Sequence, residues 1–189
     1  RVLRRGDSLS VELRDPEEDH EKYELYLKHG ERFEEGGNDD YEGFVETFFR
    51  HMPFGKVLEI RRKGRLIAAS HIDMTRTSLS AIYSYWDPEE SRLGLGTYSV
   101  LKEIELAAER NIPYVYLGYY VEENRHMSYK KRFTPNEGLM QEGKWMPLFD
   151  KEGGVCSPEL LSHGFLPVLR MEQDKSEDEG EESEDELTE

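Results

Sequence analysis

The segment Arg125–Phe133 (RHMSYKKRF) is the strongest local concentration of basic residues in an otherwise acidic chain. It places four cations and a histidine within eight residues and interleaves them with aromatic rings. Lys and Arg neutralise phosphates while aromatic rings stack on unpaired bases, which is what a single-stranded nucleic acid requires. The segment therefore indicates a nucleic-acid contact, and a solvated helix face is the simpler alternative.

A second candidate site is the glycine-bearing turn at residues 91–97 (SRLGLGT), between a predicted strand and a predicted helix. At the start of a helix the backbone N–H groups are unpaired and the helix dipole is positive, so an anion is stabilised there. We predict that the anion site contains four residues: Gly94, Gly96, Thr97 and Tyr98. A turn that only allows close helix packing is the alternative, because two glycines alone are a weak signal.

Aromatic residues gather in two predicted strands on either side of this turn. Aromatic residues in strands usually belong to the core. Each buried phenol needs a hydrogen-bond partner, however, so a core with this many tyrosines is costly. We expect some of these rings to line a cleft: Tyr83, Tyr85, Trp86, Tyr114, Tyr116, Tyr119 and Tyr120.

The elements that position these residues follow from hydrophobic periodicity. Residues 8–14 alternate as a strand, and a helix follows Asp15-Pro16. The clearest amphipathic helix runs from Tyr41 to Met52 and is closed by Pro53. Lys63-Gly64 joins two strands as a hairpin. We expect the remaining elements to be strands at 56–62, 65–74, 78–86, 114–119, 144–149 and 165–170, and helices at 97–110 and 121–129.

The overall composition excludes several classes of protein. The chain has 189 residues, a formal net charge of −16 and one cysteine, Cys156. One cysteine cannot form an internal disulfide or a Cys-rich metal site, and the histidines show no metal-ligand spacing. The apolar runs are far shorter than the roughly 18–20 residues that cross a bilayer, and no signal peptide is visible. We expect a cytoplasmic globular protein without metal or membrane contact.

Residues 172–189 differ from the rest of the chain. They hold 11 acidic residues and one lysine, and they contain no aromatic residue. Like-charge repulsion and the lack of apolar surface keep such a run unfolded. We predict one folded domain, residues 1–171, and a disordered acidic tail. The tail is interpreted as solvating, and an electrostatic competitor for the nucleic-acid site is the sharper alternative.

The predicted element order is β-α-α-β-β-β-α-β-α-β-β, which is the order of the GNAT acyltransferase fold. We therefore predict an α/β fold of this type, with a mixed central sheet flanked by helices. In GNAT enzymes the glycine turn binds acetyl-CoA through a Gln/Arg-x-x-Gly-x-Gly/Ala pattern. Here Ser91 occupies the first position and Arg92 lies one position off. The turn thus suits an anion, while its match to the coenzyme A pattern is partial.

The sequence of residues 83–148 resembles the C-terminal domain of arginyl/leucyl-tRNA–protein transferases. The resemblance lies in YSYWDPEESRLGLGTYSVLKEIELA, then IPYVYLGYYVEENRHMSYKKRF, then PNEGLMQEGKWMPL. The last phrase is similar to the bacterial leucyl branch, and a looser likeness extends back to LRRGDSLSVELRD. Members of this family usually carry an upstream cysteine-containing domain, and this sequence opens without an initiator methionine, so we expect an upstream part.

The resemblance implies transfer of Leu or Arg from aminoacyl-tRNA to an N-terminal Asp or Glu, with no cofactor. The acceptor amine has a pKa of about 7.7–8.0, so a weak base suffices. Under this reading we assign Asp87 as the base or ammonium anchor, and a cap of the helix or turn beside Pro88 is the alternative. Tyr119 and Tyr129 orient the ester or stabilise the oxyanion.

The remaining roles concern substrate binding. The acidic acceptor side chain needs a cation, for which Lys130 or Arg132 is the candidate, with Arg125 in the same segment. The 3′ adenosine would stack on Tyr85 or Tyr120. Two other readings stay open: a coenzyme A-dependent N-acetyltransferase, and a non-catalytic remnant that binds tRNA or a degradation signal.

Overall fold

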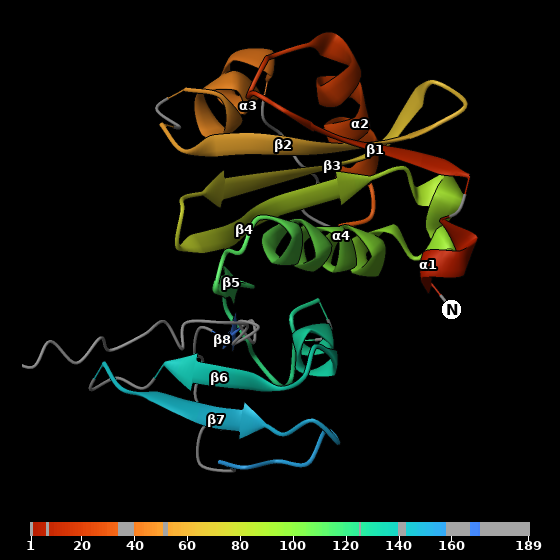
Figure 1. Ribbon diagram of the computed structural model, residues 1–189. Helices are drawn as coiled ribbons and strands as arrows, with labels where there is room; N and C mark the ends of the chain where they lie inside the picture. Colours follow the sequence, from red (N-terminus) through yellow and green to blue (C-terminus); the bar gives the residue numbers. More distant parts are fainter. Residues whose placement is uncertain are drawn as a thin grey trace, which may run out of the picture.

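The computed structural model describes residues 2–6, 8–33, 40–50, 53–124, 126–139, 143–157 and 167–170. Figure 1 shows a curved sheet with helices on both faces of its first half. The sheet has eight strands in the order β1-β2-β3-β4-β5-β8-β6-β7. The predicted GNAT-like α/β class is confirmed by this architecture and by the structural neighbours described below.

An antiparallel meander forms the first half of the sheet. Its strands are β1 (Leu9–Arg14), β2 (Gly55–Arg62), β3 (Arg65–Met74) and β4 (Ser78–Trp86). Lys63 and Gly64 join β2 to β3 with φ angles of 52° and 83°, the left-handed pair that suits a two-residue hairpin. The predicted hairpin is therefore confirmed. Residues 66–72 of β3 are all buried, because helices cover both faces of this strand.

Helices α2 (His20–Gly30) and α3 (Tyr41–Phe48) cover one face of the meander. Asp19 and Asp40 cap them by accepting a hydrogen bond from a backbone N–H group in the first turn. The opposite face is covered by α4 (Leu95–Glu109), which follows the 3₁₀ helix η1 (Pro88–Leu93). A short helix, α1 (Val2–Arg5), lies beside α4.

The second half of the sheet begins where β4 meets β5 (Tyr114–Tyr116). These strands are parallel, and they pair over only three residues, from Ser78–Tyr114 to Ser80–Tyr116. Beyond Ser80 the chain of β4 continues while the segment after Tyr116 leaves the sheet. This divergence positions the cleft described below. The remaining strands are β6 (Asn136–Leu139), β7 (Trp145–Phe149) and β8 (Pro167–Arg170), with η2 (Ser128–Arg132) before β6.

Several predicted elements differ from the observed ones. The predicted helix at 121–129 is wrong: turns lead into η2, because the Asn124 side chain accepts the N–H of His126 and competes with helical pairing. The strand predicted at 114–119 ends at Tyr116, and β6 and α1 were not predicted. The predicted strand at 165–170 is described only at 167–170. The tail at 172–189 lies outside the described residues.

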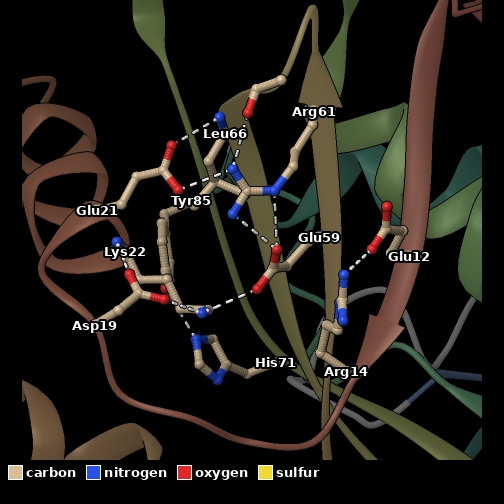
Figure 2. A network of polar contacts seen from close by, with 11 residues as sticks. Glu12, Arg14, Asp19, Glu21, Lys22, Glu59, Arg61, Leu66, His71 and Tyr85 are labelled. Atoms are coloured by element: carbon tan, nitrogen blue, oxygen red, sulfur yellow. Dashed lines mark hydrogen bonds and ion pairs between the residues drawn. The ribbon is translucent and has the colours of Figure 1, made fainter.

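An ion-pair cluster joins α2 to β2 on the face of the sheet that α2 covers (Figure 2). The ammonium group of Lys22 pairs with Asp19 and lies 2.9 Å from Glu59 Oε1. The guanidinium group of Arg61 bridges Glu59 and Glu21 at 3.0 and 2.8 Å. Every carboxylate in this cluster therefore has a cation beside it.

Candidate functional site

The divergence of β4 from the segment after β5 opens a cleft of about 380 Å³. One wall is β4 from Ala81 to Trp86, and the other is residues 117–119 together with Tyr129 and Lys130. A second cavity of about 340 Å³ lies at the start of α4. The two cavities adjoin each other, because five residues line both: Arg32, Trp86, Gly96, His126 and Tyr129.

The start of α4 suits an anion. Gly94 has φ 69° and ψ 44°, a left-handed conformation that ends η1 and begins α4 in one residue. No side chain caps α4, and its first turn contains no acidic residue. The first N–H groups of α4 and the positive end of its dipole are thus left for a ligand. Gly94, Gly96 and Thr97 line this cavity, as the sequence predicts.

Trp86 forms the aromatic wall beside this helix start. A Cβ atom on Gly96 would lie 3.1 Å from the Trp86 ring, so this glycine permits the close approach of α4 to the indole. Arg32 is exposed, and its guanidinium carbon lies 4.6 Å from the centroid of the Trp86 ring. A cation over an aromatic face, next to free N–H groups, suits a phosphate and a base together.

His29 holds Trp86 from the helix α2. Its Nδ1 lies 3.2 Å from the backbone nitrogen of Trp86, which donates to it. Burial lowers the pKa of His29 to about 4, so the imidazole is neutral at pH 7 and can accept this hydrogen bond. His29 thus fixes the end of β4, where the cleft meets the anion-binding turn.

Lys130 faces the other part of the cleft. Its Nζ donates to the carbonyl oxygen of Tyr119 at 2.6 Å. Among the described residues no carboxylate lies within ion-pair distance of this ammonium group. Burial lowers the pKa of Lys130 to about 8. The cleft therefore holds a cation that can still donate to a carboxylate supplied by a ligand.

Tyr119 and Tyr129 also lie in the cleft. The Tyr119 side chain is 64% exposed, and Tyr129 is half-buried. Burial, and then the nearby Glu103 carboxyl, raise the pKa of Tyr129 to about 12. Its hydroxyl therefore stays protonated at neutral pH and can act as a hydrogen-bond donor.

Asp87 does not fit its predicted role as the base. It is 1% exposed, and its carboxylate contacts Lys28 and Arg65 at 2.9 and 2.5 Å while accepting the N–H of Glu89. Burial alone would raise the pKa of Asp87, but the hydrogen bonds from Lys28 and Arg65 outweigh it and lower the pKa. A base needs a raised pKa and a free lone pair, so Asp87 instead caps η1.

Four further predicted residues lie away from the cleft. The rings of Tyr85 and Tyr120 are fully buried, so neither offers a face for stacking on a base. Tyr98 lies on the far side of α4 and packs against Gly6. Arg132 is exposed on η2 and is not among the residues that line either cavity. Arg125 lies outside the described residues.

Sequence reasoning missed Arg32, His29 and Phe33 as cleft residues. His29 lies in the last turn of α2, and Arg32 and Phe33 lie in the turn that follows it. All three are more than 50 positions before Trp86 along the chain, and no spacing links them to the glycine turn. Among the described residues no group of three His, Cys, Asp or Glu side chains gathers as a metal site would require. No helix in the same part of the chain is long and apolar enough to span a bilayer.

Solved structures with similar folds include acetyltransferases. A probable acetyltransferase of the GNAT family from Chromobacterium violaceum superposes with a TM-score of 0.57 at 13% identity, covering 87% of this chain and 88% of that chain. The PaiA N-acetyltransferase from Thermoplasma acidophilum, in complex with coenzyme A, gives 0.55 at 12% identity, covering 86% and 99%. At this identity the likeness establishes the fold alone.

Sequence relatives are closer. An aspartate/glutamate leucyltransferase from Hahella chejuensis is 32% identical over 159 residues, covering 78% of this chain and 64% of its own length. One from Methylobacillus flagellatus is 33% identical over 152 residues, covering 78% and 60%. The chain thus spans less than two thirds of these relatives. The family profile described as arginine-tRNA-protein transferase, C terminus, matches residues 21–140. Since this match covers more than half of the sequence, the chain belongs to the arginine-tRNA-protein transferase C-terminal family.

Proposed function

We propose that the chain transfers leucine from leucyl-tRNA to the N-terminal Asp or Glu of a protein. The observation that carries this proposal is the pair of adjoining cavities, which has the start of α4 at one end and, at the other, a lysine without an ion-pair partner among the described residues. The curated relatives bear the name aspartate/glutamate leucyltransferase, which favours leucine over arginine as the donated residue.

The donor would occupy the end of the cleft at α4. A phosphate near the 3′ end of the tRNA would accept hydrogen bonds from the backbone N–H groups that follow Gly94. The terminal adenine would stack on the exposed guanidinium plane of Arg32, which lies over the Trp86 ring, rather than on Tyr85 or Tyr120. This arrangement brings the ester toward Tyr129, which lines both cavities.

The acceptor would occupy the end of the cleft at Lys130. A side-chain carboxylate of Asp or Glu would accept a charge-assisted hydrogen bond from the ammonium group, whose hydrogen-bond partner within the described part of the chain is the Tyr119 carbonyl. The acceptor amine then attacks the ester carbon. The hydroxyls of Tyr129 and of the exposed Tyr119 would donate hydrogen bonds to the oxygen that becomes negative in the tetrahedral intermediate.

A transfer assay tests this proposal. The chain is incubated with radiolabelled leucyl-tRNA or arginyl-tRNA and with peptides that begin with Asp, Glu or Ala. We expect label on the Asp and Glu peptides from leucyl-tRNA only. Transfer from arginyl-tRNA alone would correct the donor. No transfer from either would overturn the proposal for this chain, and a parallel incubation with acetyl-CoA would reveal acetylation instead.

A further inference from the structure

A chain of hydroxyl groups leads from the cleft to a buried carboxyl group in the middle of α4. Glu103 is 0% exposed and faces the sheet. The hydroxyl of Ser70, on β3, lies 2.5 Å from Glu103 Oε1 and is equally buried. The hydroxyl of Ser84, on β4, lies 2.6 Å from that of Ser70, and Ser84 lines the cleft. Two serines therefore connect the cleft to an acid that no ligand can touch directly.

The hydrogen-bond directions along this chain are fixed by the number of protons available. When Glu103 is ionised, it can only accept, so Ser70 must donate its single proton to Oε1. Ser84 must then donate to Ser70, and the lone pairs of the Ser84 oxygen are left to accept from a group in the cleft. When Glu103 is protonated the same chain can run in the opposite direction. The arrangement can therefore carry a proton inward or outward.

The surroundings of Glu103 contain no opposite charge among the described residues. Strands β3 and β4 contribute only serine hydroxyls at this position, and the titratable group that faces it from η2 is Tyr129. On the outer side of α4, Lys102 pairs with Glu105 at 2.6 Å. Glu103 Oε2 accepts no hydrogen bond within the described ranges. Burial raises the pKa of Glu103 to about 7, against a weaker lowering by Ser70.

A carboxyl group that is buried without a cation or a second donor is costly to the fold. A purely structural link between α4 and the sheet would be made equally well by a glutamine, which carries no charge. The connection to the cleft through two hydroxyls is what distinguishes Glu103 from such a link. Ser84, the outer hydroxyl of this connection, lines the same cleft as Tyr129 and Lys130.

We propose that Glu103 receives, through Ser70 and Ser84, the proton that leaves the attacking amine. This inference rests on the proposed transferase function, and within it Glu103 is a positioning residue because it acts through Ser84. The amine nitrogen bonds to the ester carbon and gives one proton to Ser84. Ser84 passes its own proton to Ser70, and Ser70 passes its proton to Glu103.

The second half of the step reverses this movement. The bond between the ester carbon and the ribose oxygen breaks, and the ribose oxygen takes a proton. Glu103 returns the proton to Ser70, which releases one to Ser84, and Ser84 protonates the departing hydroxyl. One C–N bond forms, one C–O bond breaks and one proton moves from nitrogen to oxygen, so Glu103 and both serines end as they began.

The decisive experiment compares pH profiles of kcat for the wild type, Glu103→Gln and Ser84→Ala, with leucyl-tRNA saturating. We expect kcat to fall on the order of 100-fold in both variants. In Glu103→Gln the acidic limb of the profile near pH 7 should disappear, while the KM for leucyl-tRNA stays within twofold. The acceptor amine also titrates in this pH range, so the profile is measured with two peptides whose α-amines differ in pKa. A limb caused by the amine shifts in pH between the two peptides, and a limb caused by Glu103 does not.

Matched controls come from the same elements. Glu105→Gln removes an exposed carboxylate two positions along α4, and Ser80→Ala removes a hydroxyl from β4 outside the chain of contacts. Both should keep kcat within about twofold. If Glu103→Gln retains the wild-type pH profile, or loses activity equally at every pH, the proton relay is wrong while the transferase proposal stands.

A measurement without turnover separates the two proposals. Carbon-13 NMR of glutamate carboxyl groups follows the titration of Glu103, assigned as the resonance absent from Glu103→Gln. We expect a midpoint near neutral pH. A midpoint near 4.5, the ordinary value for Glu, overturns the relay whether or not transfer occurs. A wild-type chain that transfers nothing overturns the proposed function, and with it the role of Glu103 in that reaction.

Discussion

The two faces of the central sheet treat buried charge in opposite ways. On the face covered by α2, Lys22 has a side chain only 4% exposed and lies against Asp19 and Glu59, so each charge has a partner (Figure 2). On the face covered by α4, Glu103 has no cation among the described residues, and in the cleft beside β4 Lys130 has no anion among them. Both of these unpaired groups belong to the cleft or connect to it.

The pKa directions follow this difference. Burial alone would lower the pKa of Lys22 and raise that of Glu59, yet hydrogen bonds from their partners reverse both shifts and keep the pair charged. For Glu103 and Lys130 the effect of burial prevails, so the pKa values of both side chains move toward neutral pH. Pairing thus makes one face of the sheet stable and inert, while the lack of pairing leaves the other face able to exchange protons near pH 7.

The largest expected effect comes from breaking the paired face. Lys22→Met leaves Glu59 and Asp19 short of a cation in a buried site, and we expect the free energy of unfolding to fall by about 4 kcal/mol. Urea denaturation at pH 7 measures it. The control Lys56→Met removes a partly exposed pair with Asp15 and should cost about 1 kcal/mol or less. Equal losses in the two variants would contradict the comparison.

Removing the unpaired acid should have the opposite sign. The folded-state pKa of Glu103 is raised from 4.5 to about 7, so the folded chain binds more protons than the unfolded chain between these values. Wild-type stability is therefore lost as pH rises from about 4.5 to about 7. Glu103→Gln lacks this loss. Between pH 4 and pH 8 the free energy of unfolding of the variant should therefore rise by about 3 kcal/mol relative to that of the wild type.

Denaturation curves at pH 4 and pH 8 measure this gain, with Glu105→Gln as the matched control on the same helix. A difference between wild type and Glu103→Gln that is the same at both pH values would show that the buried carboxyl titrates normally. The comparison between the two faces would then lose its electrostatic basis.

Lys130→Ala tests the unpaired cation. Loss of one charge-assisted hydrogen bond should lower kcat/KM for Asp-terminated peptides about 30-fold, toward the value for Ala-terminated peptides. Because the pKa of Lys130 is lowered to about 8, the wild type should also lose its preference for acidic acceptors as pH rises through 8. Lys131→Ala is the control, since Lys131 pairs with Glu122 at 2.7 Å. An equal loss in both variants would remove Lys130 from acceptor recognition.

The smallest effect is expected at the rim of the cleft. Arg32→Ala removes the exposed guanidinium group over Trp86 and should weaken tRNA binding about fivefold at moderate salt. The slope of log affinity against log salt should fall by about one. Filter binding over a salt series measures both quantities. Arg14→Ala on β1 serves as the control, and the same slope change there would indicate a diffuse charge effect rather than a site.

Much of the fold could be predicted because local patterns specify it. Residues close together in the sequence determine three of the predicted elements. These are the hairpin at Lys63-Gly64, the amphipathic helix α3 and the glycine turn before α4. The element β6 could not be predicted, because its Asn-Glu-Gly-Leu sequence has no β-branched residue and depends on pairing with β7 and β8.

The site was predictable only where one segment supplies it. The glycine turn and Lys130 come from continuous motifs, and they do line the cleft. Asp87 was assigned the wrong role because its partners, Lys28 and Arg65, are distant in sequence. Glu103 did leave a signal: it falls between Val100 and Ala107 on the buried stripe of its helix. An acid within an apolar stripe marks a position that sequence reasoning should question.

The short pairing of β4 with β5 has a consequence for isotope labelling of the backbone. Past Ser80 one edge of β4 has lost its neighbouring strand. The amide of Trp86 still donates to His29, but alternate amides between Ala81 and Tyr85 are not bonded to β3 and face the cleft. These amides should exchange rapidly with deuterium in the empty protein, even though they belong to the central sheet. An extended ligand lying along this edge would slow their exchange, so occupancy of the cleft could be followed residue by residue without any reaction.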